Sequence, residues 1–237
     1  MERVVLNLDN EDLKANIIGL YNIDVYEFSR EIEAAEGVAF WKKKYSIIDS
    51  RNMKFYKKTV KDEINRMCKI NKIRDKSFKK TIERLFEILD LDIGIINRKI
   101  SEISTSDMYK LYLVLRTAVS KDFYIFCDFT RYLDRNGIKC FLRLLSLLRA
   151  NEKTVFIADS DVNVLYNYTN IIVYQEGYDF KAININQQFV NDKIFLDNNI
   201  PFPTLVEITS LARKNKNVRL SYHKDVRDIM KDIYKHV

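Results

Sequence analysis

The sequence predicts an α/β fold, and two short apolar runs separated by a helical pattern give the main reason. The runs are Phe123–Cys127 and Thr154–Ala158, both rich in β-branched or aromatic residues. An amphipathic segment, Ile138–Leu148, lies between them, and Asp128 and Asp159 follow the two runs. Buried strands joined in this way are typical of a parallel strand–helix–strand unit. Ligands bind at the carboxyl ends of such strands, so the acids mark the place where we expect a site.

The N-terminal part of the chain continues the sheet pattern. Weak alternation over residues 1–10 predicts an edge strand, and Asn16–Tyr21 predicts a buried one. A helix is expected over Val25–Ala35, with Asp24 as its N-cap. Tyr45–Ile48 then predicts another short strand that runs into an aspartate.

Residues 58–100 predict a helical segment set between two strand-bearing regions. The stretch Thr59–Lys69 is expected to be helical. A second helix is indicated by apolar residues that recur on one face between Phe78 and Leu89. A capping box at Ser104–Asp107 predicts the start of another helix, which continues to about Val119.

The C-terminal part predicts a hairpin followed by two helices. Ile171–Tyr174 and Phe180–Ile185 are expected to pair as antiparallel strands at the sheet edge. A looser region begins at Phe189, before two prolines that mark a boundary. Amphipathic helices are then expected over Thr204–Lys214 and His223–Val237.

Composition excludes several classes of protein. The 237 residues, 47% of them hydrophobic, suit one α/β domain with a small appendage. The longest apolar runs hold about five residues, too few to cross a bilayer, so we expect a cytoplasmic protein. The three cysteines do not have the spacing of metal ligands, and the only two histidines lie near the C-terminus. We therefore expect neither a metal centre nor a histidine-based catalytic triad.

The net charge of +7 leaves two interpretations open. Basic residues are spread through the chain, with short runs at Trp41–Lys44, Phe55–Lys58 and Arg213–Lys216. This scattered distribution of basic residues is typical of a solvated surface. We therefore expect no specific nucleic-acid partner. A basic nucleic-acid-binding protein stays as an alternative, and it would bind less tightly as salt rises.

The glycines exclude a phosphate-cradling loop built in the usual way. Such a loop needs glycines a few residues apart, because its backbone approaches the phosphates closely. The sequence has five glycines, and they are widely spaced: Gly19, Gly37, Gly94, Gly137 and Gly177.

Several segments nevertheless follow a known order. Phe55–Ile64 resembles the segment after the Q-loop of ABC transporter ATPases, and Ile103–Asp107 stands where their signature motif would be. Phe126–Thr130 is in register with their Walker B strand, and Asp134, after Leu133, with their D-loop.

The C-terminal half continues this order. Lys153–Asp161 is similar to the strand before the switch histidine, and Asn199–Arg213 to a C-terminal extension. The chain thus resembles ABC transporter ATP-binding proteins, most closely the ATPase subunits of energy-coupling-factor (ECF) transporters.

This resemblance implies an ABC-ATPase-like (P-loop NTPase-like) fold with a mostly parallel sheet. It implies a domain over residues 1–197, with a helical subdomain at about 58–120, and a helical extension over 198–237. Its implied partners are another ABC ATPase, a transporter membrane subunit, or a second copy joined through the C-terminal helices. A membrane partner would hold the protein at the inner face of the cell membrane.

Departures from the family's motifs affect phosphate binding first. The segment Gly19–Ser29 aligns with the Walker A loop, yet Phe28 stands where the family has its lysine. Only Ser29 matches, as the hydroxyl on the magnesium side. In the signature motif, Ser104 is followed by Thr105 and Ser106 in place of glycines.

The remaining departures affect the metal and the attacking water. Asp49 takes the position of the Q-loop glutamine, and Cys127 that of the magnesium-binding aspartate. A thiol is a poor ligand for magnesium. Asp128 replaces the catalytic glutamate and Ser160 the switch histidine, while Asp134 keeps the D-loop acid.

These departures lead to the hypothesis of a pseudo-ATPase, a subunit that keeps the fold and acts by protein–protein interaction. No catalytic residue, metal site or bound cofactor is then expected, because phosphoryl transfer depends on the groups that are missing. The alternative is an ECF-type subunit that still binds or hydrolyses ATP with magnesium.

Overall fold

The computed structural model describes residues 17–36, 45–72, 76–177, 179–185, 195, 200–216, 223 and 225–236. They divide into two compact units. The terminal unit combines the chain up to Phe28 with the chain from Ile157 onward, and the central unit runs from Ser29 to Phe156. The edge strand predicted at residues 1–10, the basic run 41–44 and the looser region 189–194 lie outside the described residues.

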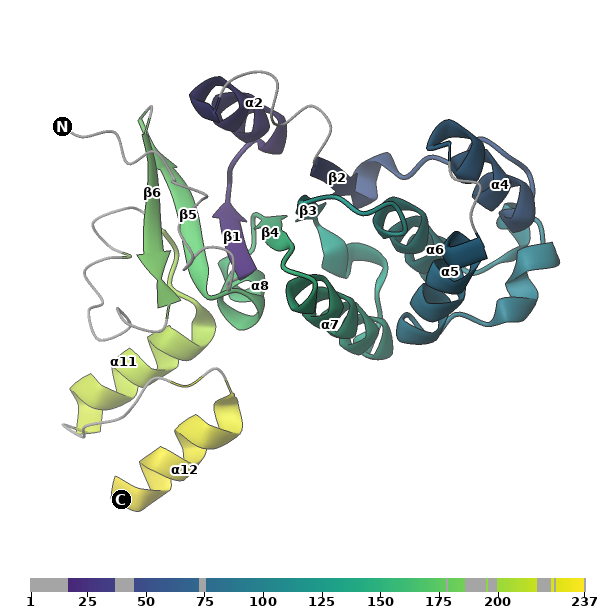
Figure 1. Ribbon diagram of the computed structural model, residues 1–237. Coiled ribbons are helices and arrows are strands. Elements are labelled where there is room, and N and C mark those ends of the chain that lie inside the picture. Colours follow the sequence, from purple (N-terminus) through teal and green to yellow (C-terminus); the bar gives the residue numbers. More distant parts are fainter. Residues whose placement is uncertain are drawn as a thin grey trace. The chain divides into compact units, whose positions relative to one another are not determined.

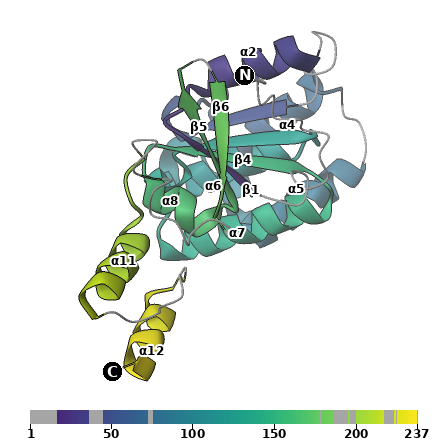
Figure 2. The ribbon, with the colours of Figure 1, turned by 90° about the vertical axis from the view of Figure 1, so that its left-hand side faces the viewer.

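The terminal unit contains the predicted N-terminal strand and the hairpin. β1 (Ile17–Tyr21) pairs in parallel with β5 (Ile171–Glu176), and β5 pairs antiparallel with β6 (Asp179–Asn184). The strands of this unit follow the order β1-β5-β6, and in the sequence β4 (Thr154–Asp159) spans the boundary between the two units. Figure 2 shows β5 and β6 side by side as green arrows. The predicted edge hairpin is therefore confirmed.

Gly19 lies inside β1, paired with Ile172, and its missing side chain makes room for helix α8 (Val162–Tyr168). A Cβ atom on Gly19 would lie 3.0 Å from Thr169 Oγ1 and 3.3 Å from Leu165 Cβ. The chain needs glycine here for close packing of a helix on a strand. α8 itself was not among the predicted elements.

Two helices end the terminal unit, as predicted. α11 covers Thr204–Lys216 and α12 covers Val226–His236, and Figure 2 shows one following the other. The second begins later than the predicted His223, because the Asp225 carboxylate accepts a hydrogen bond from the amide of Arg227 and so caps the helix.

Hydrogen bonds connect these helices to α8. The Thr204 amide donates to Asn163 Oδ1 at 2.7 Å, and the Tyr166 hydroxyl donates to the His223 carbonyl at 3.1 Å. The start of each C-terminal helical segment is thus fixed to the same short helix.

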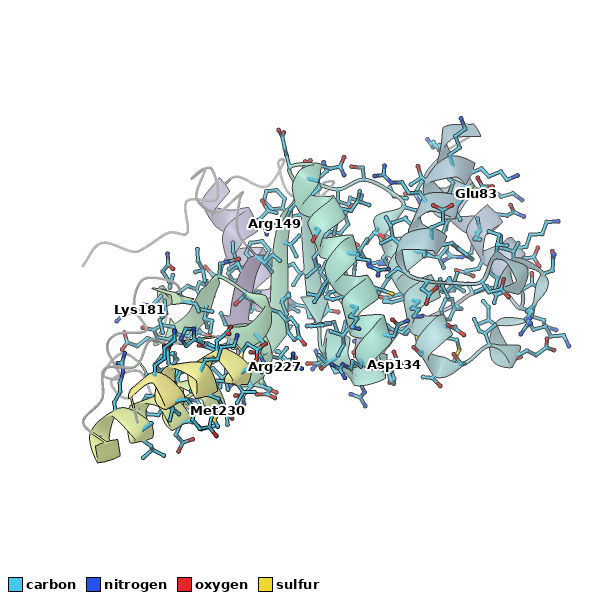
Figure 3. The ribbon with its side chains drawn as sticks, turned by 90° about the horizontal axis from the view of Figure 1, so that it is seen from below. Glu83, Asp134, Arg149, Lys181, Arg227 and Met230 are labelled. Carbon is cyan, nitrogen blue, oxygen red and sulfur yellow. The ribbon has the colours of Figure 1, made fainter. Side chains whose placement is uncertain are left out.

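The central unit is built on the predicted strand–helix–strand segment. β2 (Tyr45–Asp49) pairs in parallel with β3 (Phe123–Cys127), and the strand order is β2-β3-β4. α7 (Arg135–Ala150) connects β3 to β4, and Figure 3 labels Asp134 and Arg149 at its two ends. Phe141 of α7 stacks on Phe129 with ring centroids 4.3 Å apart, which anchors the helix on the core.

The predicted helical segment forms the rest of the central unit. α4 covers Val60–Ile70, α5 Lys76–Ile88 and α6 Thr105–Thr117, and α5 packs beside α6 (Figure 1). As predicted, Ser104 caps α6 by accepting from the Asp107 amide. In the described part of this unit, 3-10 turns connect these elements at Ser50–Asn52, Ile93–Asn97, Ile100–Glu102 and Phe129–Tyr132.

The mixed α/β fold class and the mostly parallel sheet are confirmed. Among the described residues, no helix is long and apolar enough to cross a membrane.

Candidate functional site

Asp49 ends strand β2 and forms the centre of a polar cluster in the central unit. Its side chain is 2% exposed. The carboxylate accepts hydrogen bonds from the Arg51 amide at 2.9 Å, from Arg51 Nε at 3.0 Å and from Asn52 Nδ2 at 2.9 Å. Burial acts to raise the pKa of Asp49, but the donors of Arg51 and Asn52 together outweigh burial, so this pKa lies below its ordinary value.

Arg51 joins Asp49 to Asp128, the acid that follows β3. Arg51 Nε lies 3.0 Å from Asp49 Oδ1 and 3.2 Å from Asp128 Oδ2. The hydrogen bond to Asp49 raises the pKa of Arg51, and the charges of Asp49 and Asp128 act in the same direction. The half-exposed guanidinium is therefore a cation shared by two carboxylates.

The backbone holds Asp128 in this position. Its dihedral angles, φ 49° and ψ 42°, are left-handed, a conformation that aspartate tolerates better than most residues. The Ser50 hydroxyl donates to the Asp128 carbonyl at 3.0 Å. The turns after β2 and β3 are thus tied together by a hydrogen bond as well as by Arg51.

Cys127 and Tyr109 complete the surroundings of this cluster. Cys127 is buried at the end of β3, in register with Asp49. Tyr109 of α6 is fully buried, and its hydroxyl has no hydrogen-bond partner among the described residues. Burial raises the pKa of Tyr109, and the charges of Cys127 and Asp49 add to this effect, so the phenol stays neutral.

In the terminal unit, the segment aligned with a Walker A loop is a tight connection. Only Asn22, Ile23 and Asp24 separate β1 from α2 (Val25–Glu36). Asp24 Oδ1 accepts hydrogen bonds from the amides of Tyr26 at 2.8 Å and Glu27 at 3.0 Å. The first amides of the helix are therefore occupied by a carboxylate of the same chain, as the predicted N-cap requires.

Phe28 belongs to the hydrophobic core of the terminal unit. Its side chain is fully buried, and its ring meets Phe180 of β6 edge to face with centroids 5.3 Å apart. Ser29, the next residue, is also buried. The position aligned with the phosphate-binding lysine thus carries an apolar ring.

The other predicted positions lie at the starts of helices. Ser104 makes its hydrogen bonds with Asp107, and Thr105 and Ser106 form the first turn of α6. Asp134 caps α7 by accepting from the Gly137 amide at 2.7 Å. Ser160 is exposed after β4, next to the N-cap of α8. Ser104 and Asp134 therefore cap helices, whereas Ser160 lies in the turn after a strand.

A nucleotide triphosphate with magnesium does not fit these side chains. At the start of α2 a phosphate would meet the Asp24 carboxylate, and Gly19–Ser29 contains no lysine. At the end of β3 the residue aligned with a magnesium-binding aspartate is the buried thiol of Cys127, and Arg51 lies between the two carboxylates. No cluster of three or more histidine, cysteine or acidic side chains suited to a metal occurs in the described part of the chain.

Asp49 and Asp128 are two separate aligned positions in the sequence, and in the structure both carboxylates lie next to Arg51. Sequence reasoning missed Arg51 and Tyr109. Arg51 stands two residues after the acid that ends β2, and an arginine so close to a candidate site carboxylate was a usable signal. Tyr109 offered none, because an aromatic on an apolar helix face is the usual pattern of a core residue.

The fold is that of the ATP-binding subunits of ABC transporters. CbiO1 from Clostridium perfringens, part of the ABC transporter complex CbiONQ, matches with a TM-score of 0.58 and 10% identity, over 83% of this chain and 88% of CbiO1. An ATP-binding subunit of an ABC transporter matches with a TM-score of 0.60 and 11% identity, over 83% of this chain and 88% of that one.

The resemblance extends to sequence. The energy-coupling factor transporter ATP-binding protein EcfA of Malacoplasma penetrans (strain HF-2) is 22% identical over 182 residues, which are 76% of this chain. The match covers 63% of EcfA, less than two thirds of its length. No protein-family model matches the chain. Similarity to ABC transporter ATP-binding proteins, predicted from the order of motifs, is thereby confirmed.

Proposed function

We propose that this chain is a non-catalytic, pseudo-ATPase subunit that acts through protein–protein contacts with an ABC transporter of the ECF type. Its fold would present the same interaction surfaces as an ATPase, without turning over nucleotide. The proposal keeps Asp49, Asp128 and Ser160 out of catalysis, and it assigns no nucleotide-binding role to Phe28, Ser29, Ser104–Ser106 or Asp134.

The start of α2 is the observation that carries this proposal. Phosphate binding at a helix start depends on free amides, a positive local charge and close backbone approach. Asp24 occupies the amides of Tyr26 and Glu27 and brings a negative charge to the same place. Phe28 supplies a buried ring where a lysine would neutralise phosphate. Each change alone weakens phosphate binding, and together they oppose it.

The partners follow from the similarity to EcfA and CbiO1, a part of a complex. We propose another ABC ATPase or a transporter membrane subunit as the partner, with a second copy of this chain as the remaining case. The proposed division is a main domain over 1–197, with its helical subdomain at about 58–120, and an extension over 198–237. A cytoplasmic position at the inner face of the membrane would result from the membrane partner.

A second candidate function rests on the sequence match itself. EcfA is named an ATP-binding protein, and 22% identity over 182 residues is consistent with a subunit that still binds ATP and magnesium. In that case Asp128 would be the residue to position the attacking water.

Calorimetry with ATP and magnesium on the full chain tests the proposal. We expect no binding heat at nucleotide concentrations up to the millimolar range. Micromolar binding, together with an ATPase rate that Asp128→Ala abolishes, would establish the second candidate instead. Co-expression with an ATPase and a membrane subunit of an ECF transporter, followed by co-purification, tests the partner independently of nucleotide.

A further inference from the structure

We infer that the Arg51 guanidinium is a resident cation that takes the place of a divalent metal between Asp49 and Asp128. The carboxyl ends of β2 and β3 are thereby assembled without metal, and removing Arg51 would uncover a cation site. This inference deepens the proposed function and rests on it, but it comes from different residues than those at the start of α2.

The geometry places one positive group between two carboxylates from different strands. Arg51 Nε lies 3.0 Å from Asp49 Oδ1 and 3.2 Å from Asp128 Oδ2. These acids follow neighbouring parallel strands, where the register sets Asp49 opposite Cys127. Asp128, the residue after Cys127, therefore lies just beyond the end of β3, and its left-handed backbone conformation bends the chain there.

A divalent cation would need similar oxygen ligands at a shorter distance. Magnesium binds oxygen at about 2.0–2.1 Å and calcium at about 2.3–2.6 Å. An ion at the position of Arg51 Nε would need the two carboxylate oxygens to move inward by roughly 1 Å. The two carboxylates cannot bind a metal and the guanidinium at the same position, so a metal ion can enter only where Arg51 has been removed.

The charges explain why the arginine is retained in this position. Asp49 is almost fully buried, and a buried carboxylate without a partner is strongly unfavourable. The planar guanidinium offers several donors, so Nε serves both acids while Nη2 lies 3.3 Å from Asp49 Oδ2. A permanent cation of this kind does not depend on nucleotide or on the metal concentration of the cell.

Thermal unfolding with and without divalent cations tests the inference on the full chain. The variant Arg51→Gln removes the charge and keeps an amide donor, so the protein can still fold. We expect a lower unfolding midpoint in chelator, and a rise of about 2–6 °C when 5 mM calcium or magnesium chloride is added. The unchanged protein should shift by less than about 1 °C under the same conditions, because its two carboxylates are already paired with Arg51.

Arg66→Gln is the matched control. Arg66 also pairs with a buried carboxylate, Glu63, but the amides of Tyr56 and Lys57 bind that acid as well, and among the described residues no second carboxylate forms an ion pair with Arg66. This variant should lose stability without recovery by metal. The double variant Arg51→Gln/Asp128→Asn should likewise lose the recovery, since one of the two charged ligands is gone.

Terbium luminescence gives a direct readout of the uncovered site. Terbium prefers the same oxygen ligands as calcium and emits when excited through a nearby tyrosine, and Tyr109 lies on α6, which contacts β2 and the turn after β3. Emission is expected for Arg51→Gln and not for the unchanged protein. The inference would be overturned if metal stabilised the unchanged protein and Asp128→Asn removed that effect. It would also be overturned if the Arg51→Gln variant did not respond to metal.

The two proposals fail separately. Binding of ATP to the unchanged chain would contradict the pseudo-ATPase function and leave the metal response of Arg51→Gln intact. An absent metal response would contradict the role of Arg51 while the chain still fails to bind ATP.

Discussion

The ring of Phe28 meets the ring of Phe180 edge to face, with centroids 5.3 Å apart and planes at 87°. This contact joins the first turns of α2 to β6 within the hydrophobic core of the terminal unit. The residue at the position of a phosphate-binding lysine thus has a packing role, and a lysine there would be buried. Introducing a lysine at this position would therefore damage the fold.

The variant Phe28→Lys should lose at least about 3–5 kcal/mol of unfolding free energy. Removing a fully buried phenylalanine costs this much by itself, and burying an ammonium adds to it. Urea unfolding followed by circular dichroism measures the change. If the proposed function is right, this variant should not bind ATP either, because Asp24 still occupies the first amides of the helix.

Glu31→Lys provides the control for this change, since Glu31 is exposed on the same helix. It should alter the unfolding free energy by no more than about 0.5 kcal/mol. A Phe28→Lys protein as stable as Glu31→Lys would show that the core contact with Phe180 contributes little.

Most of the fold followed from local patterns in the sequence. The strand–helix–strand segment from Phe123 to Asp159 was identifiable because apolar runs of five or six residues flank a strongly amphipathic helix. The start of α6 was equally clear, because Ser104 and Asp107 have the spacing of a capping box.

What the sequence did not predict depends on short elements or on distant pairing. Helix α8 has seven residues and only three buried side chains, too few for a helical period to be recognised. The role of Arg51 depends on the register between β2 and β3. This register brings Asp128 next to Arg51, although the two residues are far apart in the sequence. No local pattern contains that information. Whether the predicted site positions lack activity stays a prediction.

Gly19→Ala should destabilise the protein by about 1–3 kcal/mol, because its Cβ would press on Thr169 Oγ1 and on Leu165. A double-mutant cycle with Thr169→Ala, followed by chemical denaturation of each variant, measures the coupling free energy between the two positions. Removing the hydroxyl should reduce the cost of the added methyl group by a measurable coupling energy. Strictly additive costs would place the strain elsewhere than at this contact.

The pKa of Asp49 predicts a loss of stability in acid. The folded-state pKa lies below that of the unfolded chain, so the unfolded state binds the proton first as pH falls. The contribution of Asp49 is complete above its unfolded pKa of about 3.9 and is lost as pH falls from there through the lower folded value.

Urea unfolding between pH 6 and pH 2.5 measures this contribution, with Asp49→Asn as the comparison. The variant is expected to be less stable near pH 6, because it loses the charged partner of Arg51. The difference between the two proteins should shrink below about pH 4. A constant difference over the whole range would mean that Asp49 has the same pKa in both states.

Glu63 should be among the most sensitive polar residues of the central unit. Its side chain is 1% exposed, and its carboxylate accepts from the amides of Tyr56 at 2.9 Å and Lys57 at 2.8 Å and from Arg66 Nε at 2.9 Å. It thereby fixes the segment before α4 onto that helix. Glu63→Ala leaves two amides and a guanidinium without their acceptor and should cost about 3–5 kcal/mol.

Glu63→Gln distinguishes the charge from the acceptor. The amide oxygen can still accept from Tyr56 or Lys57, so the loss should be smaller, about 1–3 kcal/mol, and amide hydrogen exchange at these two residues should rise less than in Glu63→Ala. Exposed Glu83 of α5, labelled in Figure 3, serves as the control, and Glu83→Gln should change stability by no more than about 0.5 kcal/mol. Equal costs for Glu63→Gln and Glu63→Ala would show that the charge on Glu63, paired with Arg66, carries the whole effect and that the two backbone amides do not depend on this side chain.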